Sequence, residues 1–213
     1  MKAGFYLELI RTIFQAVDDD GNLRNRVVAI TSATPGEGVS YVVDLIATEL
    51  ATQTERRVLR MDAGVFDLFD LSDPRVVAEL CKETGIENLL TLSSDKSVAE
   101  PVMAVTDGGS SLVRTSNSDD WDRRPGYRAE CMKALRWNFD YVVIDCPSFA
   151  ASSDTTALAS FVDGVSIVVK AGTTRRGQIQ RAKKLVEAAG GTFLGFVLNQ
   201  RRYPMPGWLY RRL

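Results

Sequence analysis

The sequence predicts an α/β fold with three layers, in which a mostly parallel β-sheet is covered by helices on both faces. Two observations lead to this prediction. Short runs rich in valine and isoleucine alternate along the chain with segments whose apolar residues repeat at the helical period. The runs are apolar throughout and not only at alternate positions, which is typical of strands that are buried on both sides of a parallel sheet.

The candidate elements follow from local composition. Apolar runs predict strands at 26–32, 57–62, 141–145, 164–170 and 192–198, and a shorter one at 111–115. Helical periodicity predicts helices at 40–52, 73–84, 128–137 and 175–189. Asp73 and Pro74 have the residue types that begin a helix, and Gly190 and Gly191 have the type that ends one. Residues 93–107 fit neither pattern, and the polar stretch 116–126 predicts a surface loop.

Composition limits the kinds of function. A chain of 213 residues that is 45% hydrophobic can bury one sizeable core, so we expect a single domain over 1–213, with a helical segment at 1–25 and a basic, aromatic tail at 200–213. A net charge of −1 argues against a nucleic-acid partner. The absence of histidine excludes catalysis by histidine and metal sites that use histidine ligands. No apolar run can span a bilayer and the three cysteines are scattered, so we expect a cytoplasmic protein with free thiols.

The most informative segment is the glycine-rich sequence ATPGEGVS at 33–40, between a predicted strand and a predicted helix. Glycines in this context let consecutive backbone N–H groups point at one anion, and the start of the helix adds its positive end. The standard phosphate loop ends in Gly-Lys-Ser/Thr, whereas this one ends in Gly38, Val39 and Ser40. Ser40 keeps a hydroxyl for Mg²⁺, but the side chain of Val39 cannot form a hydrogen bond to a phosphate. The alternative is a glycine turn that only caps the helix.

Two aspartates end predicted strands. Asp62 follows the run VLRM, and Asp145 follows the run YVVI. In phosphate-loop proteins, a carboxylate at the end of a strand near the loop holds Mg²⁺ directly or through water. We therefore predict that Asp62 and Asp145 are catalytic and that they form a metal site with Ser40. The alternative for each aspartate is a turn or a helix cap.

Together these segments resemble the cytoplasmic domain of bacterial tyrosine kinases that work with polysaccharide-export proteins, a group of deviant-Walker P-loop ATPases. The resemblance rests on ITSATPGEGVS at 30–40, VLRMDAG at 58–64, FDYVVIDCPS at 139–148, VDGVSIVVKAGTT at 162–174 and GFVLNQ at 195–200. ELIRT at 8–12 resembles the Glu-x-x-Arg segment through which such kinases form rings. The order of the segments is more specific than any one of them.

The resemblance implies that the chain binds ATP and Mg²⁺ and that its partner is a membrane polysaccharide co-polymerase, which controls chain length. The protein would then work in the cytoplasm at the inner face of the cell membrane, as a homo-oligomer joined through Glu8 and Arg11. Asn199 would contact adenine, and its alternative is a loop-forming asparagine. The implied nucleotide contacts are Pro35, Gly36, Glu37, Gly38, Val39, Ser40, Tyr41 and Asn199.

The chain departs from this family at positions that matter for chemistry. Besides the loop lysine, the family's second strand ends in Asp-x-Asp-x-Arg, and here Gly64 and Phe66 replace the second aspartate and the arginine. Asp44 stands where the family usually has asparagine. Active kinases of the family carry a tyrosine-rich tail, and this tail offers only Tyr203 and Tyr210.

Three functions stay open at this point. A tyrosine-kinase-like regulatory protein of exopolysaccharide or capsule production, with weak or no ATP hydrolysis, agrees with the missing lysine. An active ATP-dependent tyrosine autokinase agrees with the order of the motifs. A Min/Par-type ATPase would share the scaffold, but that group carries an additional lysine at the start of its loop, near Thr34 here. A basic group from a neighbouring copy, with Arg11 as the candidate, would compensate for the missing lysine.

Overall fold

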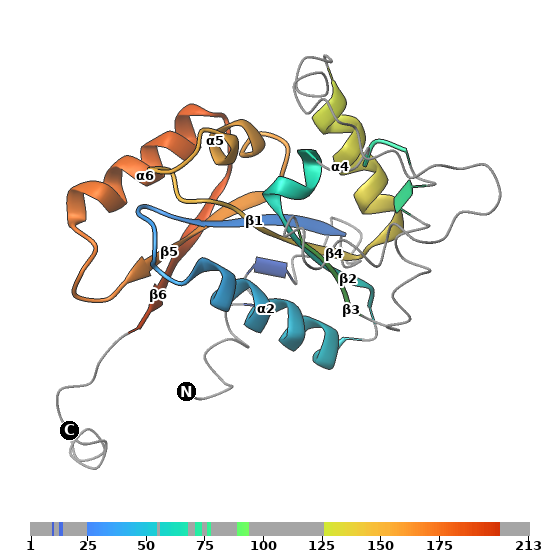
Figure 1. Cartoon of the computed structure of the whole chain (residues 1–213), viewed down its shortest axis with the longest axis horizontal. Helices are drawn as coiled ribbons and strands as arrows, with labels where there is room; N and C mark the ends of the chain where they lie inside the picture. The colour runs from blue at the N-terminus through green and yellow to red at the C-terminus, as the bar shows by residue number, and fades with distance from the viewer. Residues whose placement is uncertain are drawn as a thin grey trace, which may run out of the picture.

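The three predicted layers are present in the computed structural model, which describes residues 10, 13–14, 25–54, 56–67, 71–73, 76–77, 89–93 and 126–200. A central sheet separates helices on its two faces (Figure 1). One face is covered by α2 (Val39–Gln53). The other face carries α4 (Tyr127–Asn138), α5 (Asp154–Leu158) and α6 (Arg176–Ala188). The described part of the chain therefore has the architecture that the sequence predicts.

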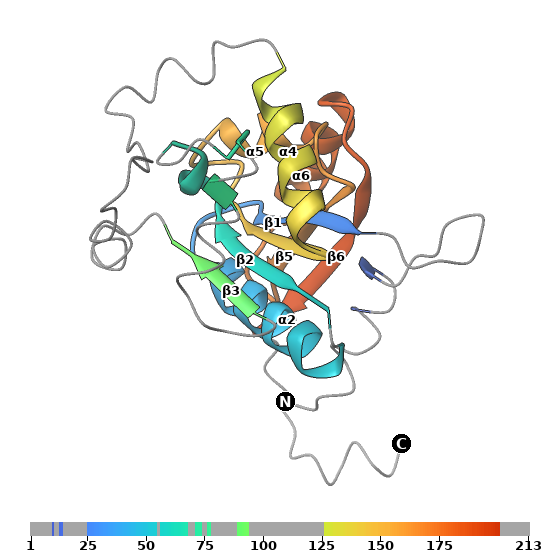
Figure 2. The ribbon, with the colours of Figure 1, turned by 90° about the vertical axis from the view of Figure 1, so that its right-hand side faces the viewer.

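Among the described residues, the sheet has six strands in the order β3-β2-β4-β1-β5-β6, and every pairing between them is parallel. Figure 2 shows β3 beside β2, on the side of the sheet away from β6. Five strands agree with the predicted segments to within one residue, namely β1 (Arg26–Ser32), β2 (Val58–Asp62), β4 (Tyr141–Asp145), β5 (Gly164–Lys170) and β6 (Phe193–Asn199). The sixth, β3 (Leu89–Leu92), was not predicted, because four residues are too few to show a pattern.

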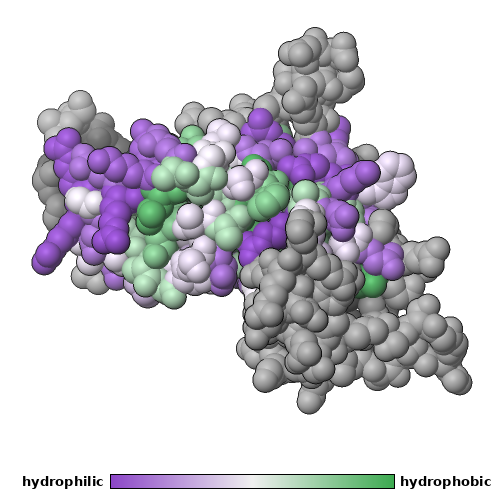
Figure 3. Space-filling view, turned by 90° about the horizontal axis from the view of Figure 1, so that it is seen from above, coloured by the Kyte–Doolittle hydropathy of each residue, from purple (hydrophilic) through white to green (hydrophobic). Residues whose placement is uncertain are grey.

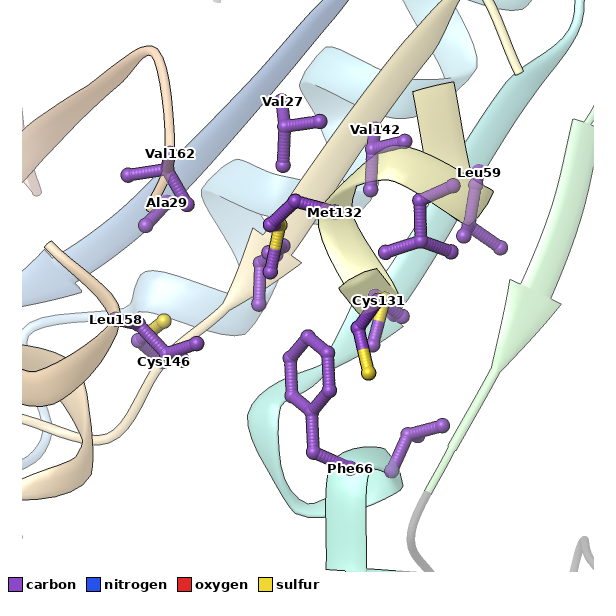
Figure 4. Close-up of a cluster of buried hydrophobic side chains, with 14 of the residues drawn as sticks. Val27, Ala29, Leu59, Phe66, Cys131, Met132, Val142, Cys146, Leu158 and Val162 are labelled. Carbon is purple, nitrogen blue, oxygen red and sulfur yellow. The ribbon is translucent and has the colours of Figure 1, made fainter. Parts of the chain in front are cut away.

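Alternate residues of the central strands enter two separate cores. Val27 and Ala29 of β1 belong to the core beneath α4, α5 and α6, part of which Figure 4 shows with Met132 of α4. Val28 and Ile30 belong to the core beneath α2. Since successive side chains of a strand point to opposite faces, a strand between two cores needs apolar residues at every position. This requirement explains the apolar runs in the sequence.

The helices also agree with their predicted positions where the structure describes them. Ala182 and Val186 are the buried residues of α6, whereas hydrophilic side chains cover much of the outer surface on the side of α6 (Figure 3). Short α5 was not predicted, and neither was the 3₁₀ turn η1 (Ala63–Asp67). None of the described helices has both the length and the hydropathy that crossing a membrane requires.

Several predicted segments fall largely outside the described residues. For the helix at 73–84, the backbone N–H groups of Val76 and Val77 donate to the carbonyl of Asp73 at 3.1 and 3.3 Å, which is one helical turn. In the N-terminal segment, Ile10, Ile13 and Phe14 are helical and buried in the core beneath α2. The predicted strand at 111–115, the loop at 116–125 and the tail at 201–213 lie outside the described residues.

The loop between β1 and α2 requires glycine at two positions. Gly36 and Gly38 have φ angles of 79° and 85°, in the left-handed region that disfavours side chains. A Cβ atom on Gly38 would lie 2.4 Å from Nδ2 of Asn199, whereas one on Gly36 would meet nothing within 4 Å. Gly38 is thus required both for its backbone angle and for the close approach of β6.

This difference predicts different costs for two matched substitutions. Gly36→Ala should lower the free energy of unfolding by about 1 kcal/mol, the cost of a side chain in the left-handed region. Gly38→Ala should lower it by about 3 kcal/mol, because the Asn199 amide must also move from its hydrogen bond. Urea denaturation of the two variants and the parent measures both values, and equal costs would contradict the close packing of Asn199.

Candidate functional site

An open pocket of about 620 Å³ lies at the carboxyl ends of β1, β2 and β4. This is the edge at which parallel α/β sheets bind their ligands, because the loops that leave the strands meet there. The pocket is lined by Ser32, Pro35, Gly36, Gly38, Val39, Ser40, Tyr41, Asp62, Ala63, Gly64, Asp145, Cys146, Pro147, Ser148 and Ala151. Most of the residues that the sequence analysis selects are therefore neighbours in space.

Two selected residues, Glu37 and Asn199, are not in this lining and lie behind the loop. The side chain of Glu37 is turned into the protein and is only 2% exposed. Its carboxylate accepts the backbone N–H of Thr34 at 3.1 Å and the hydroxyl of Thr174. The Asn199 amide donates to the Glu37 carbonyl at 3.0 Å. These contacts hold the loop against β6 and the loop after β5, and they place both side chains where they support the loop.

The mouth of the loop is suited to an anion. Gly38 is the N-cap of α2, and no side chain caps the helix there. The first N–H groups of a helix have no partners within the helix, and they carry its positive end. Val39 occupies the first helical position, where its partly buried side chain packs against the core beneath α2. The pocket therefore has the start of a helix at the loop, with a valine side chain at the position where a standard phosphate loop has lysine.

The two strand-end aspartates face each other across the sheet. Asp62 and Asp145 are paired in register between β2 and β4. The hydroxyl of Ser40 lies near enough to Asp145 to lower the pKa of its carboxyl, so the last residue of the loop is close to the end of β4. The hydroxyl of Ser93 donates to Asp62 at 3.0 Å. Ser40, Asp62 and Asp145 therefore lie together at the pocket, whereas their role as a catalytic metal site stays a prediction.

Sequence reasoning missed Arg60, which lies among the carboxylates. Its Nε donates to Asp44 Oδ1 at 2.9 Å, and one terminal nitrogen donates to Asp145 Oδ2 at 3.2 Å. The other terminal nitrogen lies 3.8 Å from Asp62 Oδ2. The Arg60 side chain is 12% exposed. The available signal was a charged residue inside the otherwise apolar run VLRMD, because a buried charge requires a partner.

The surroundings of Asp145 favour its protonated form. Burial is the main cause that raises the pKa of this carboxyl, and the negative charges of Asp62 and Asp44 act in the same direction. The Ser40 hydroxyl and the positive charge of Arg60 oppose the rise. Arg60 is therefore a group that favours the charged form of Asp145 against burial and against the neighbouring carboxylates.

The chemistry of the donor set can be compared with the needs of Mg²⁺. This ion prefers oxygen ligands in near-octahedral geometry, and Ser40, Asp62 and Asp145 offer such oxygens. However, Oδ2 of each aspartate faces the Arg60 guanidinium, which is itself a cation. Among the described residues, no group of three or more acidic, cysteine or histidine side chains is arranged to hold a metal ion. The present arrangement does not fit a divalent cation at these carboxylates.

The pocket offers no reactive thiol. Cys146 lines it, but burial raises the pKa of this thiol well above its usual range, so it stays protonated at neutral pH. Among the described residues, the other cysteine is Cys131, which is buried in the core beneath α4. Glu8, Arg11, Tyr203 and Tyr210 lie outside the described residues.

Comparisons with known proteins show which proteins the chain resembles in sequence. No protein-family model matches it. It is 28% identical over 211 residues to tyrosine-protein kinase CpsD of Streptococcus agalactiae, which covers 92% of this chain and 82% of that protein. It is 27% identical over 197 residues to tyrosine-protein kinase YwqD of Bacillus subtilis strain 168, which covers 91% and 79%.

A solved structure extends the comparison to the fold. The crystal structure of the VpsO kinase domain has a TM-score of 0.60 and 22% sequence identity, over 94% of this chain and 95% of that one. The likeness agrees with the parallel sheet and with the loop at the carboxyl end of β1. The chain is thus similar in sequence to bacterial tyrosine-protein kinases and similar in fold to a solved kinase domain, and it carries Val39 where the standard phosphate loop has lysine.

Proposed function

We propose that this protein is a tyrosine-kinase-like regulator of exopolysaccharide or capsule production and export, with weak or no ATP hydrolysis. The observation that carries the proposal is Val39 at the first position of α2, where it lines the pocket and packs on the core. The relatives named as tyrosine-protein kinases support the kinship. The neutral side chain at the loop supports the loss of catalytic strength.

The size of the loss follows from the missing charge. A lysine on the terminal phosphates makes charge-assisted hydrogen bonds worth about 1.5–3 kcal/mol each. Removal of one preorganised charge stabiliser slows an enzyme by about 10²–10³. Gly64, which lines the pocket, stands where the family has its second aspartate, and Phe66 stands at the place of the family's arginine. These losses affect one site, so they compound without being additive.

The charged side chains around the pocket also weaken the binding of a polyphosphate. Its lining includes the carboxylates of Asp62 and Asp145, and Arg60 is already engaged by them. A polyphosphate in this pocket would therefore meet negative side chains opposite the backbone N–H groups of the loop. P-loop ATPases in general use a lysine and Mg²⁺ to balance these charges, and this chain lacks the lysine.

The proposed setting of the protein follows its kinship. A membrane polysaccharide co-polymerase would be the partner, so the domain would act in the cytoplasm at the inner face of the membrane. Copies would associate through Glu8 and Arg11, next to the buried residues Ile10, Ile13 and Phe14 that fix this segment on the domain. The partner would then sense the occupancy or assembly of the domain more than its turnover.

A second candidate is an active tyrosine autokinase. The position of Ser40 close to Asp145 favours it, because a working site would require the end of the loop beside the strand-end carboxylate. In that case a neighbouring copy would provide the missing cation, with Arg11 as the candidate.

Nucleotide affinity separates these candidates first. We expect ATP–Mg²⁺ to bind the purified protein more weakly than the low micromolar range, because no side chain replaces the lysine. Isothermal titration calorimetry measures the dissociation constant, with a titration of buffer into protein as the control. A dissociation constant in the low micromolar range or tighter would show that the backbone N–H groups of the loop bind ATP–Mg²⁺ without a lysine.

Phosphorylation of the protein itself tests turnover. After incubation with ATP and Mg²⁺, we expect little or no phosphotyrosine, because the pocket lacks the lysine and the second aspartate. Mass spectrometry of the intact chain measures the stoichiometry, and protein incubated without ATP is the control. One phosphate on tyrosine for each chain, without added kinase, would favour the autokinase.

Restoring the lysine tests the scaffold. Val39→Lys should raise the affinity for ATP–Mg²⁺ about tenfold or more, because one charge-assisted contact can form at the start of α2. Turnover should recover less, because Gly64 still lacks a carboxylate. The free energy of unfolding should change by about 1 kcal/mol or less, since the lysine stem covers much of the surface that valine covers.

The matched control for this variant is Thr48→Lys. It adds the same charge to an exposed position of α2, about 13 Å further along the helix. We expect it to leave the affinity for ATP–Mg²⁺ unchanged within about twofold. If Val39→Lys and Thr48→Lys had equal affinities for ATP–Mg²⁺, the loop would not act as a phosphate nest.

A further inference from the structure

The carboxylates at the pocket come from three different elements and surround one guanidinium. Asp44 belongs to α2, Asp62 ends β2, and Asp145 ends β4. Arg60 lies within 4.0 Å of all of them, at 2.9, 3.8 and 3.2 Å respectively. A guanidinium carries five N–H donors in a rigid fork, so one side chain can serve several carboxylates that approach from different directions.

The burial of Arg60 and Asp145 makes it costly to remove the guanidinium from the carboxylates. The side chains of Arg60 and Asp145 are each 12% exposed, so water screens their charges poorly. Removing one partner of a buried ion pair is strongly destabilising, since the other charge is left without compensation. The Arg60 side chain is held by contacts on two strands and one helix, which fixes it in the centre of the cluster.

A divalent cation would compete with Arg60 for the same oxygens. Oδ2 of Asp145 and Oδ2 of Asp62 lie 3.2 and 3.8 Å from the guanidinium, and carboxylate oxygens are also the hard ligands that Mg²⁺ prefers. Two cations cannot share these oxygens at short range without strong repulsion. The backbone of β2 is paired on both sides, with β3 and β4, so the Cα atom of Arg60 is fixed beside the carboxylates and the guanidinium has to be drawn away from its contacts before a metal ion can enter.

We infer that Arg60 takes the place of a divalent cation in this pocket, so that the carboxylates of Asp44, Asp62 and Asp145 share one positive charge that comes from within the chain. The cluster therefore has no need of a metal ion for its stability. Removing the guanidinium converts it into a divalent-cation site. The inference goes beyond the proposed function, since it concerns the carboxylates and holds whether or not the loop binds a nucleotide.

The test compares Arg60→Met with the parent and with Arg56→Met, in the absence of nucleotide. Methionine keeps much of the unbranched stem of arginine and removes the charge. Arg56 is the matched control, because it also forms an ion pair with an aspartate but does not line the pocket. Its terminal nitrogen lies 3.4 Å from Oδ1 of Asp140. Mn²⁺ is the probe, and the electron paramagnetic resonance signal of free Mn²⁺ measures its binding.

The parent and Arg56→Met should bind Mn²⁺ with a dissociation constant of about 1 mM or weaker. For each of these two proteins, the midpoint temperature of unfolding should be the same in EDTA as in Mg²⁺. Arg60→Met should bind one Mn²⁺ for each chain at least about tenfold more tightly. It should unfold at a lower temperature in EDTA and recover when Mn²⁺ is added. An Arg60→Met protein that folds and binds Mn²⁺ no better than the parent would overturn the inference.

Two further measurements keep the test decisive if Arg60→Met does not fold. Arg60→Lys retains the charge and should still exclude Mn²⁺, so Mn²⁺ binding by this variant at about 100 µM or tighter would overturn the inference. The parent alone gives the second result. A rise in its unfolding temperature with Mg²⁺ that Asp145→Asn abolishes would show that the parent's carboxylates hold the metal, contrary to the inference. Because no nucleotide is present, these outcomes are independent of the proposed function.

Discussion

The central sheet is buried on both faces, and this constraint determines where charged groups can be placed. A strand between two cores has apolar neighbours on each side, so a charge in it costs free energy unless it is paired. Asp62 and Asp145 meet the constraint by standing at strand ends, where the pocket opens. Arg60 is the exception, because it lies inside β2. Its contacts with the surrounding carboxylates are the compensation that this position requires.

The loop of the pocket is supported from behind by contacts that do not involve the missing lysine. The buried carboxylate of Glu37 joins the loop to Thr34 and Thr174, and Asn199 holds the Glu37 carbonyl. The geometry of an anion nest depends on these contacts and on the glycines. The strength of binding depends on charge. Val39 therefore separates two properties that a standard phosphate loop combines, namely the shape of the nest and the cation that completes it.

The similarity to tyrosine-protein kinases is evidence about the fold of this chain more than about its catalytic activity. At 22% identity to the VpsO kinase domain the shared feature is the fold, and folds of this kind carry many activities. The activity of any member depends on a few side chains at the carboxyl ends of the strands. In this chain those positions hold Val39, Gly64 and Arg60 with its three carboxylates, and the proposed role in regulation rests on the first two.

The sequence by itself determined the strands β1, β4 and β5, the helix α2 and the place of the loop, because these depend on local patterns that span a few residues. It also located Asp62 and Asp145, since strand ends at one edge of a parallel sheet must meet. Only the tertiary structure decided the position of β3, the inward turn of Glu37 and the contacts of Arg60. Arg60 meets Asp44 and Asp145 across 16 and 85 residues of chain. Such contacts depend on how helices and strands pack, which no local pattern contains.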